Sequence, residues 1–149
     1  MGGIVNPSSG PAFSAYRSTD QTPSPATWTK LTANTKEFDT NGAYDNATNY
    51  RFAPTAAGYY QCSAGIMTGG GGGVGIALYK NGTEFKRGAN VGLPSGALNI
   101  SFTTMTVSAL VYFNGTTDYV EVYGYNSAGS VFVGGASTTY FQSSMIRGA

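Results

Sequence analysis

The sequence lacks histidine altogether and has a single cysteine, and both absences limit the chemistry that the chain can perform. Without imidazole there is no Ser-His or Cys-His catalytic couple and no histidine metal site. One cysteine forms neither an internal disulfide nor a cysteine-rich zinc site. Acids are few as well, with seven Asp and Glu in total. We therefore expect a protein that is not an enzyme, with no catalytic residues and no resident cofactor.

Charge is scarce over the 149 residues: eight Lys and Arg offset the seven acids and leave a net charge of +1. A chain this close to neutral generates no broad field for nucleic acid or for an anionic membrane surface. Its apolar runs are far shorter than the roughly 20 residues of a membrane-spanning helix. The N-terminal region also lacks the basic start and apolar stretch of a secretion signal. Neither nucleic acid nor a membrane is expected as a partner.

The chain is rich in glycine, with 22 residues, and in aromatics, at 13%. Such a composition, with few of the usual helix formers, favours strands and turns. Alternating stretches between turn signals predict strands at 11–18, 27–31, 36–40, 49–52, 58–67, 74–80, 84–87, 98–102, 107–113, 119–125 and 139–146. Alternation along 58–67 places Tyr60, Cys62, Ala64 and Ile66 on one face, which we expect to be the inner one. About ten short strands predict an all-β antiparallel jelly-roll sandwich.

Stretches rich in glycine and asparagine predict the connections between these strands. Asn81-Gly82 is a strong hairpin signal, and 114–118 predicts a second hairpin. Five consecutive glycines at 69–73 are too flexible to hold a strand ladder and predict a loop, as do 89–97 and 127–135. Residues 1–10 are rich in Gly, Ser and Pro and predict an extended segment, so that the jelly-roll domain proper is 11–149.

Five segments resemble segments of a known family and occur in the same order along the chain as in that family. They are PAFSAYRS at 11–18, the series of Phe38, 44–48, Arg51-Phe52, Pro54 and Gly58-Tyr59-Tyr60, the Tyr79-Lys80-Asn81-Gly82 hairpin, SALVYFNGTTDYVEVY at 108–123, and FQSSMI at 141–146. Together they resemble the complement C1q-like globular head, a branch of the tumour necrosis factor-like jelly rolls, over residues 11–147. In its Asn-Gly turns, its threonine-rich composition, its lack of a secretion signal and its RGA ending, the sequence resembles the bacteriophage and bacterial members of this family.

The resemblance implies a homotrimer, because subunits of this family pack around a threefold axis through apolar and aromatic side chains of one sheet. In this sequence several strands carry apolar or aromatic residues on both faces, more than one sandwich core needs. The candidates for the subunit-facing layer are Tyr59, Tyr60, Tyr112, Tyr123, Tyr140 and Phe141. The alternative for each of them is a place in the core of the single chain or an isolated exposed position.

Asp39 and Asp45 flank a turn, and some relatives hold calcium near the trimer apex through loop carboxylates. Calcium takes about six to eight oxygen ligands, and the sequence has no dense acidic loop. We therefore expect these aspartates to cap turn amides, with calcium as the alternative. Cys62 is expected to act as a small buried hydrophobe.

Two functions fit these observations. In the first, the chain is the C1q-like knob of a phage fibre and binds a glycan or protein of the host surface through loops at one end. In the second, it is a capsid decoration or cementing protein that docks on another virion protein through residues 1–10, with Ile4, Val5 and Pro7 as anchoring residues. The initial Met1, which suggests a whole gene product, favours the second. Either function places the protein at the virion surface.

Overall fold

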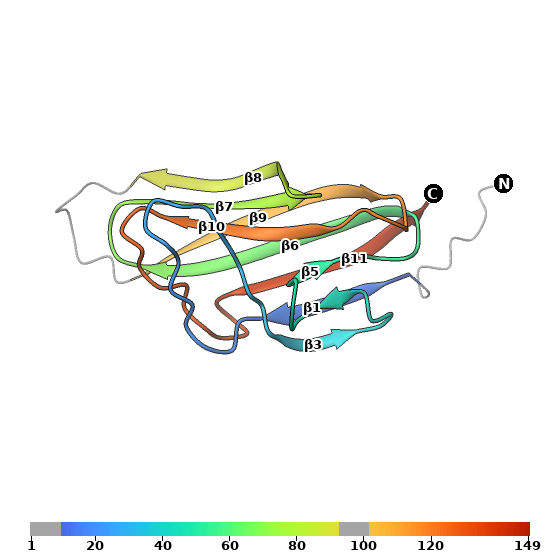
Figure 1. Ribbon diagram of the computed structural model, residues 1–149, viewed down its shortest axis with the longest axis horizontal. Helices are drawn as coiled ribbons and strands as arrows, with labels where there is room; N and C mark the ends of the chain where they lie inside the picture. The colour runs from blue at the N-terminus through green and yellow to red at the C-terminus, as the bar shows by residue number, and fades with distance from the viewer. Residues whose placement is uncertain (1–9, 93–101) are drawn as a thin grey trace.

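The computed structural model describes residues 10–92 and 102–149, which form strands and no helix. Figure 1 shows the long strands running along the length of the molecule. The strands are β1 (Ala12–Tyr16), β2 (Thr29–Lys30), β3 (Thr35–Asp39), β4 (Tyr44–Asp45), β5 (Arg51–Phe52), β6 (Gly58–Gly69), β7 (Gly73–Lys80), β8 (Thr83–Gly92), β9 (Phe102–Phe113), β10 (Val120–Asn126) and β11 (Tyr140–Gly148). Within the described residues, no helix has the length and apolarity to cross a membrane.

The strands form two antiparallel sheets. The five-stranded sheet has the order β3-β1-β11-β6-β9, and the six-stranded sheet has the order β4-β5-β10-β7-β8 with β2 beside β10. All neighbours in the five-stranded sheet come from separate parts of the chain, as when β1 pairs with β11, whereas β4-β5 and β7-β8 in the other sheet are hairpins. The predicted all-β antiparallel sandwich is confirmed.

The core lies between the inner faces of the two sheets. Along β6, the four residues Tyr60, Cys62, Ala64 and Ile66 are 0–1% exposed, so the predicted inner face is confirmed. The residues of β7 that meet them from the other sheet are also buried; they are Val74, Ile76 and Leu78. Alternation with a period of two is thus enough to place these side chains.

Aromatic rings fill one part of this core. Phe13 stacks on both Tyr44 and Phe52, with ring centroids 4.6 Å apart in each pair. Tyr60 meets Phe52 edge to face at 5.6 Å, and Phe141 meets Phe13 in the same way at 4.9 Å. Stacked and edge-to-face pairs are the favourable arrangements for aromatic rings. The residues that carry the family resemblance are largely the residues of this cluster.

Two strands, β9 and β8, are several residues longer than the sequence predicted. β9 begins at Phe102 rather than at residue 107, because its whole length pairs with β6 from Gly58↔Phe113 to Gly69↔Phe102. β8 continues to Gly92, through part of the predicted 89–97 loop, because it pairs with β7 as far as Gly73. Except for Phe102, the predicted strand at 98–102 lies outside the described residues. In both strands, long-range pairing outweighs local propensity.

The glycine run at 69–73 forms a tight turn, with its first and last residues already in strands. Gly70 and Gly72 have φ of +76° and +113°. Backbone of this kind is readily available only to glycine. The predicted loop is confirmed for the central residues, and the ends of the run belong to β6 and β7.

Candidate assembly interface

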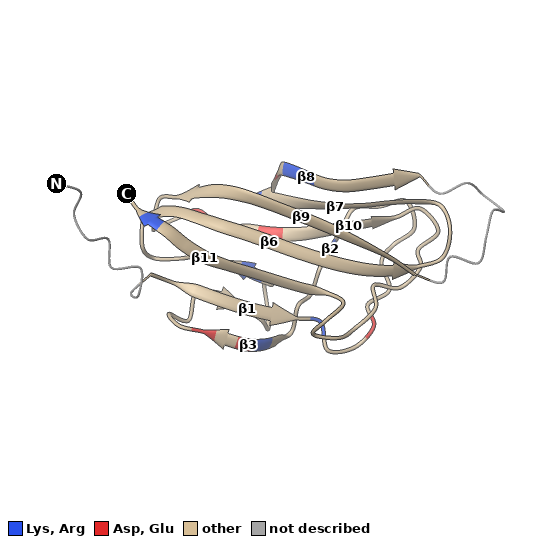
Figure 2. Ribbon diagram, turned by 180° about the vertical axis from the view of Figure 1, so that it is seen from behind, with Lys and Arg blue, Asp and Glu red and all other residues tan. Residues whose placement is uncertain are grey.

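The outer face of the five-stranded sheet is built mainly by β6 and β9, neither of which contains a charged residue. Figure 2 shows charges at the ends and edges of this side of the molecule, with few over the middle of the sheet. The outward polar side chains bond sideways to one another: Gln61 donates to the Ser108 hydroxyl (2.6 Å), and Gln142 donates to the Ser63 hydroxyl (3.1 Å). Because charged residues are depleted at the centres of protein interfaces, such a surface suits contact with another protein.

Four of the large apolar side chains exposed on this face lie together. Tyr59, Leu110, Tyr112 and Ile146 are 48%, 59%, 43% and 54% exposed. The Tyr59 and Tyr112 rings lie 5.3 Å apart. The four side chains line a hollow of about 640 Å³ together with the C-terminal residues from Arg147 onward. Clustered apolar groups of this kind mark surfaces that bind a partner. We call these four residues the apolar cluster.

Strand pairing explains why the apolar cluster forms. Tyr59 of β6 lies directly opposite Tyr112 of β9, and Gln61 lies opposite Leu110. In β11 the pairing register shifts between Met145 and Arg147, and Ile146 is the extra residue at this bulge. Alternation along β11 sends Gln142, Ser144 and Ile146 outward, because Phe141 and Ser143 are buried. Ile146 therefore joins the outward residues of β6 and β9 from a third strand.

The six aromatic candidates from the sequence fall in three places. Tyr59 and Tyr112 belong to the apolar cluster, and Tyr140 is half-buried on the same face, paired with Gly65. Tyr60 and Phe141 are 0% and 1% exposed. Both rings pack inside the sandwich, so neither can contact a second subunit. Tyr60 and Phe141 are therefore core residues and not candidates for the interface.

Tyr123 faces outward from the opposite, six-stranded sheet and stacks on Tyr79 with centroids 4.0 Å apart. The proposed anchoring residues Ile4, Val5 and Pro7 lie outside the described residues.

Leu110 and Ile146 were not among the candidates. Alternation along 107–113 could have found Leu110, because its inward neighbours Val107, Val111 and Phe113 are all buried. The same alternation along 139–146, counted from the buried Phe141 and Ser143, places Ile146 outward. Its position beside Tyr59 depends on how β11 pairs with β6.

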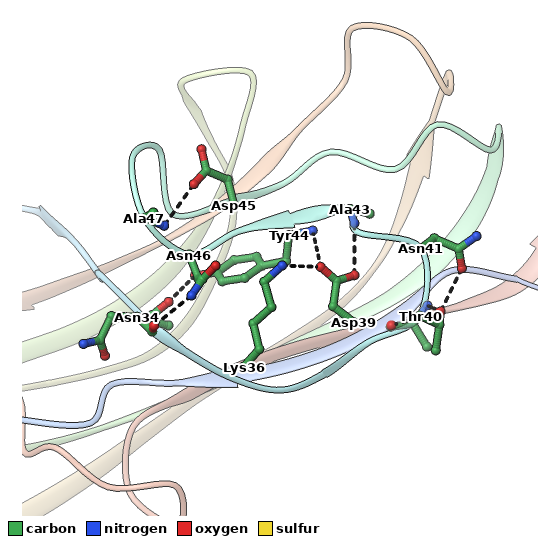
Figure 3. Close-up of polar contacts among 12 residues, drawn as sticks. Asn34, Lys36, Asp39, Thr40, Asn41, Ala43, Tyr44, Asp45, Asn46 and Ala47 are labelled. Carbon is green, nitrogen blue, oxygen red and sulfur yellow. Dashed lines mark hydrogen bonds and ion pairs between the residues drawn. The ribbon is translucent and has the colours of Figure 1, made fainter.

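Asp39 caps the turn between β3 and β4, as predicted. Figure 3 shows its carboxylate receiving the amides of Ala43 (3.0 Å) and Tyr44 (3.1 Å) and the Lys36 ammonium at 2.7 Å. Partial burial by itself raises the pKa of Asp39. The hydrogen bonds from Lys36 and from the two amides outweigh this effect and hold the pKa below its usual value.

Asp45 caps the next turn. It accepts hydrogen bonds from the backbone amides of Thr48, Ala47 and Asn49 at 2.9–3.0 Å. These amides, first Thr48 and then Ala47, hold the pKa of Asp45 well below its usual value. Both carboxylates are thus occupied by the turns they close. In the described part of the chain, no three or more His, Cys, Asp or Glu side chains gather as a metal site.

Cys62 is buried in the core, as predicted, with its sulfur 3.3 Å from the Ser143 hydroxyl. Burial raises the pKa of the thiol to about 12. A thiol in this environment remains protonated and unreactive at neutral pH.

The arrangement of the two sheets recurs in solved structures. The globular domain of zebrafish complement 1qA matches with a TM-score of 0.69 and 15% identity, over 95% of this chain and 100% of that chain. Murine APRIL, crystallised at pH 8.0, matches with a TM-score of 0.70 and 7% identity, over 93% of this chain and 100% of that chain. No protein-family model and no curated protein matches the sequence.

At identities this low, the likeness concerns the fold alone. The chain has the jelly-roll fold that the C1q globular domain shares with APRIL of the tumour necrosis factor family.

Proposed function

We propose that this chain is a non-catalytic binding module that assembles as a homotrimer through the outer face of the five-stranded sheet. The observation that carries the proposal is the apolar cluster on a face whose two main strands have no charge. Covering these four side chains removes a large apolar area from water, which is the dominant favourable contribution to protein association. The sequence resemblance to C1q-like heads, whose subunits use one sheet in this way, supports the same arrangement.

Within this proposal, the trimer is the knob of a phage fibre at the virion surface and contacts a glycan or protein of the host. Support comes from the resemblance of the sequence to bacteriophage and bacterial C1q-like members. The rigid sandwich also suits a binding role, because it holds loops such as 19–26 and 127–137 in defined positions.

The assembly is tested by multi-angle light scattering of the purified full chain. We expect a mass three times that of the 15.4 kDa chain. Leu110→Asp places a carboxylate at the centre of the apolar cluster, where it would lose hydration without a partner. This variant is expected to run as a monomer with an unchanged circular dichroism spectrum. Phe85→Asp, at an exposed residue of β8, is the matched control and is expected to remain trimeric. A wild-type mass near 15.4 kDa would overturn the proposed trimer.

Host contact is tested by the binding of labelled trimer to a panel of intact bacterial cells. Binding to at least one host is expected, and its absence across the panel would argue against a fibre knob. Deletion of residues 1–10 distinguishes the capsid-decoration function from the fibre function. If the deleted chain still forms trimers but no longer associates with virions, while wild-type trimers bind no cell, the decoration function replaces the fibre function.

A further inference from the structure

The outer face of the six-stranded sheet carries a second hollow, on the side away from the apolar cluster. Its volume is about 360 Å³, and its lining is Trp28, Arg87, Asn90 and Tyr125. The four residues come from the segment before β2 and from β8 and β10. This size lies at the lower end of the roughly 300–1,000 Å³ that small-molecule sites span. We call it the Trp28 hollow.

A glycine brings the aromatic wall of the hollow close to the sheet. Gly75 of β7 lies between its ladder partners Asn90 and Tyr125. A Cβ at Gly75 would lie 3.0 Å from Cη2 of Trp28, so the indole packs where a side chain would otherwise stand. The Trp28 and Tyr125 rings are 5.5 Å apart and meet at 43°. They therefore form two adjoining aromatic surfaces, one from the segment before β2 and one from β10.

The charge at the hollow is already neutralised. Arg87 donates to Glu84 through Nε (3.1 Å) and Nη2 (2.7 Å), while its guanidinium carbon lies 5.2 Å from the centre of the Trp28 ring. A bidentate pair of this kind directs the guanidinium charge to its own carboxylate. The Trp28 hollow consequently has little attraction for a phosphate or an acidic sugar.

Several polar groups around the hollow remain available to a ligand. Among the hydrogen bonds of the described residues, none uses the Trp28 indole N–H, the Tyr125 hydroxyl or the Asn90 side-chain amide. Together they offer donors and acceptors beside the two aromatic surfaces. An apolar side chain of a partner would leave these polar groups unpaired, whereas hydroxyl groups would satisfy them.

We propose that the Trp28 hollow binds one ring of a neutral saccharide. The weakly positive C–H groups on one face of a sugar ring suit the negative face of an aromatic ring. The sugar hydroxyls then reach the free amide, phenol and indole groups. This inference deepens the proposed function and rests on it, because it names the host ligand as a neutral glycan. The hollow is on the opposite sheet from the apolar cluster, so the proposed trimer leaves it open.

The chain offers a direct readout, because Trp28 is its only tryptophan. Wild-type protein is titrated with maltohexaose, cellohexaose, chitohexaose and mannohexaose, and with polygalacturonate and heparin fragments as acidic probes. We expect at least one neutral probe to give a saturable change in tryptophan emission, with a Kd of about 1 mM or below. No saturable change with any neutral probe, or a response to acidic probes alone, would overturn the proposal.

Variants then locate the binding. Asn90 is exposed and makes no side-chain hydrogen bond within the described residues, so Asn90→Ala should fold normally. Asn90→Ala and Tyr125→Ala are each expected to weaken the active saccharide at least about tenfold. Phe85→Ala removes an exposed aromatic from the same strand as Asn90 and serves as the control with unchanged affinity. Wild-type affinity in both hollow variants would also contradict the proposal.

Failure of this inference can be told apart from failure of the proposed function. Mass and cell binding are measured on Asn90→Ala and on wild type in parallel. If both are trimers and bind cells equally well, the Trp28 hollow is not the glycan site, and the binding-module proposal stands. If wild type is monomeric and binds no cell, the proposed function fails, and the saccharide titration alone decides whether the hollow binds sugar.

Discussion

At the scale of single residues, position along a strand decides whether an aromatic side chain serves the core or the surface. Tyr59 and Tyr60 are neighbours in β6, yet the first is 48% exposed and the second 0%. The alternation that correctly placed Cys62 and Ile66 inside also places Tyr60 with them. Treating both tyrosines as interface candidates overlooked this rule. Residue type alone cannot separate the two roles, because both positions are aromatic.

The single cysteine gives a prediction at this scale. Burial raises the pKa of Cys62 to about 12 and removes its sulfur from contact with solvent, so the thiol stays protonated and inaccessible at pH 8. We expect the native protein to resist Ellman's reagent and to react with one equivalent once it is unfolded in guanidinium chloride. Cys62→Ser is the control that should give no signal in either state. Rapid stoichiometric labelling of the native protein would show that the thiol is accessible.

At the scale of elements, the two sheets approach each other closely where β8 passes β9. A Cβ added to Gly88 of β8 would meet the Thr106 carbonyl oxygen and lie 2.6 Å from Cβ of Val107. Because a backbone atom cannot turn aside as a flexible side chain can, the strands would have to separate. Glycine at this position therefore allows the two edge strands to pack together.

We predict that Gly88→Ala lowers the free energy of unfolding by about 2 kcal/mol, within the range for overpacking. Gly92→Ala in the same strand is the matched control, because a Cβ there meets nothing within 4 Å. Urea unfolding followed by circular dichroism measures both variants. Equal stability of the two would mean that β8 can move away from β9 at little cost.

Element boundaries were the least predictable part of the fold. The sequence indicated a hairpin at Asn81-Gly82, and β7 and β8 do meet there, with Asn81 at a φ of +52°. It did not indicate that β9 extends back to Phe102, because Thr103 to Thr106 shows only weak alternation. That extension depends on the twelve-residue pairing with β6. Turn chemistry is local, whereas strand length is set by the partner.

At the scale of the whole molecule, the response to acid follows from its capped turns. Asp39, Asp45 and Asp118 all have a pKa held below the usual value. A carboxylate with a lower pKa in the folded state stabilises the fold above its unfolded pKa, near 3.9, and that stability is lost as the pH falls. No histidine titrates between about pH 5 and 8.

We therefore expect the midpoint of thermal unfolding to be flat from about pH 5 to 8 and to fall below about pH 4. Differential scanning calorimetry across this range provides the measurement. Asp45→Asn, which keeps one amide-accepting oxygen but has no charge to lose, should show a smaller decrease in acid than wild type. An unfolding midpoint that stays constant down to pH 3 would contradict the role assigned to these carboxylates.

The sequence by itself determined the fold class of the chain, an all-β sandwich with an aromatic core, and its composition, with no histidine and one cysteine. These properties depend on composition and on alternation within single strands, which are local. Only the tertiary structure decided which side chains share a surface. Leu110 and Ile146 meet Tyr59 through the pairing of β9 and β11 with β6, and Trp28 meets Arg87 and Tyr125 across three separate segments. Such groupings depend on the pairing register between distant strands, which no single stretch of sequence encodes.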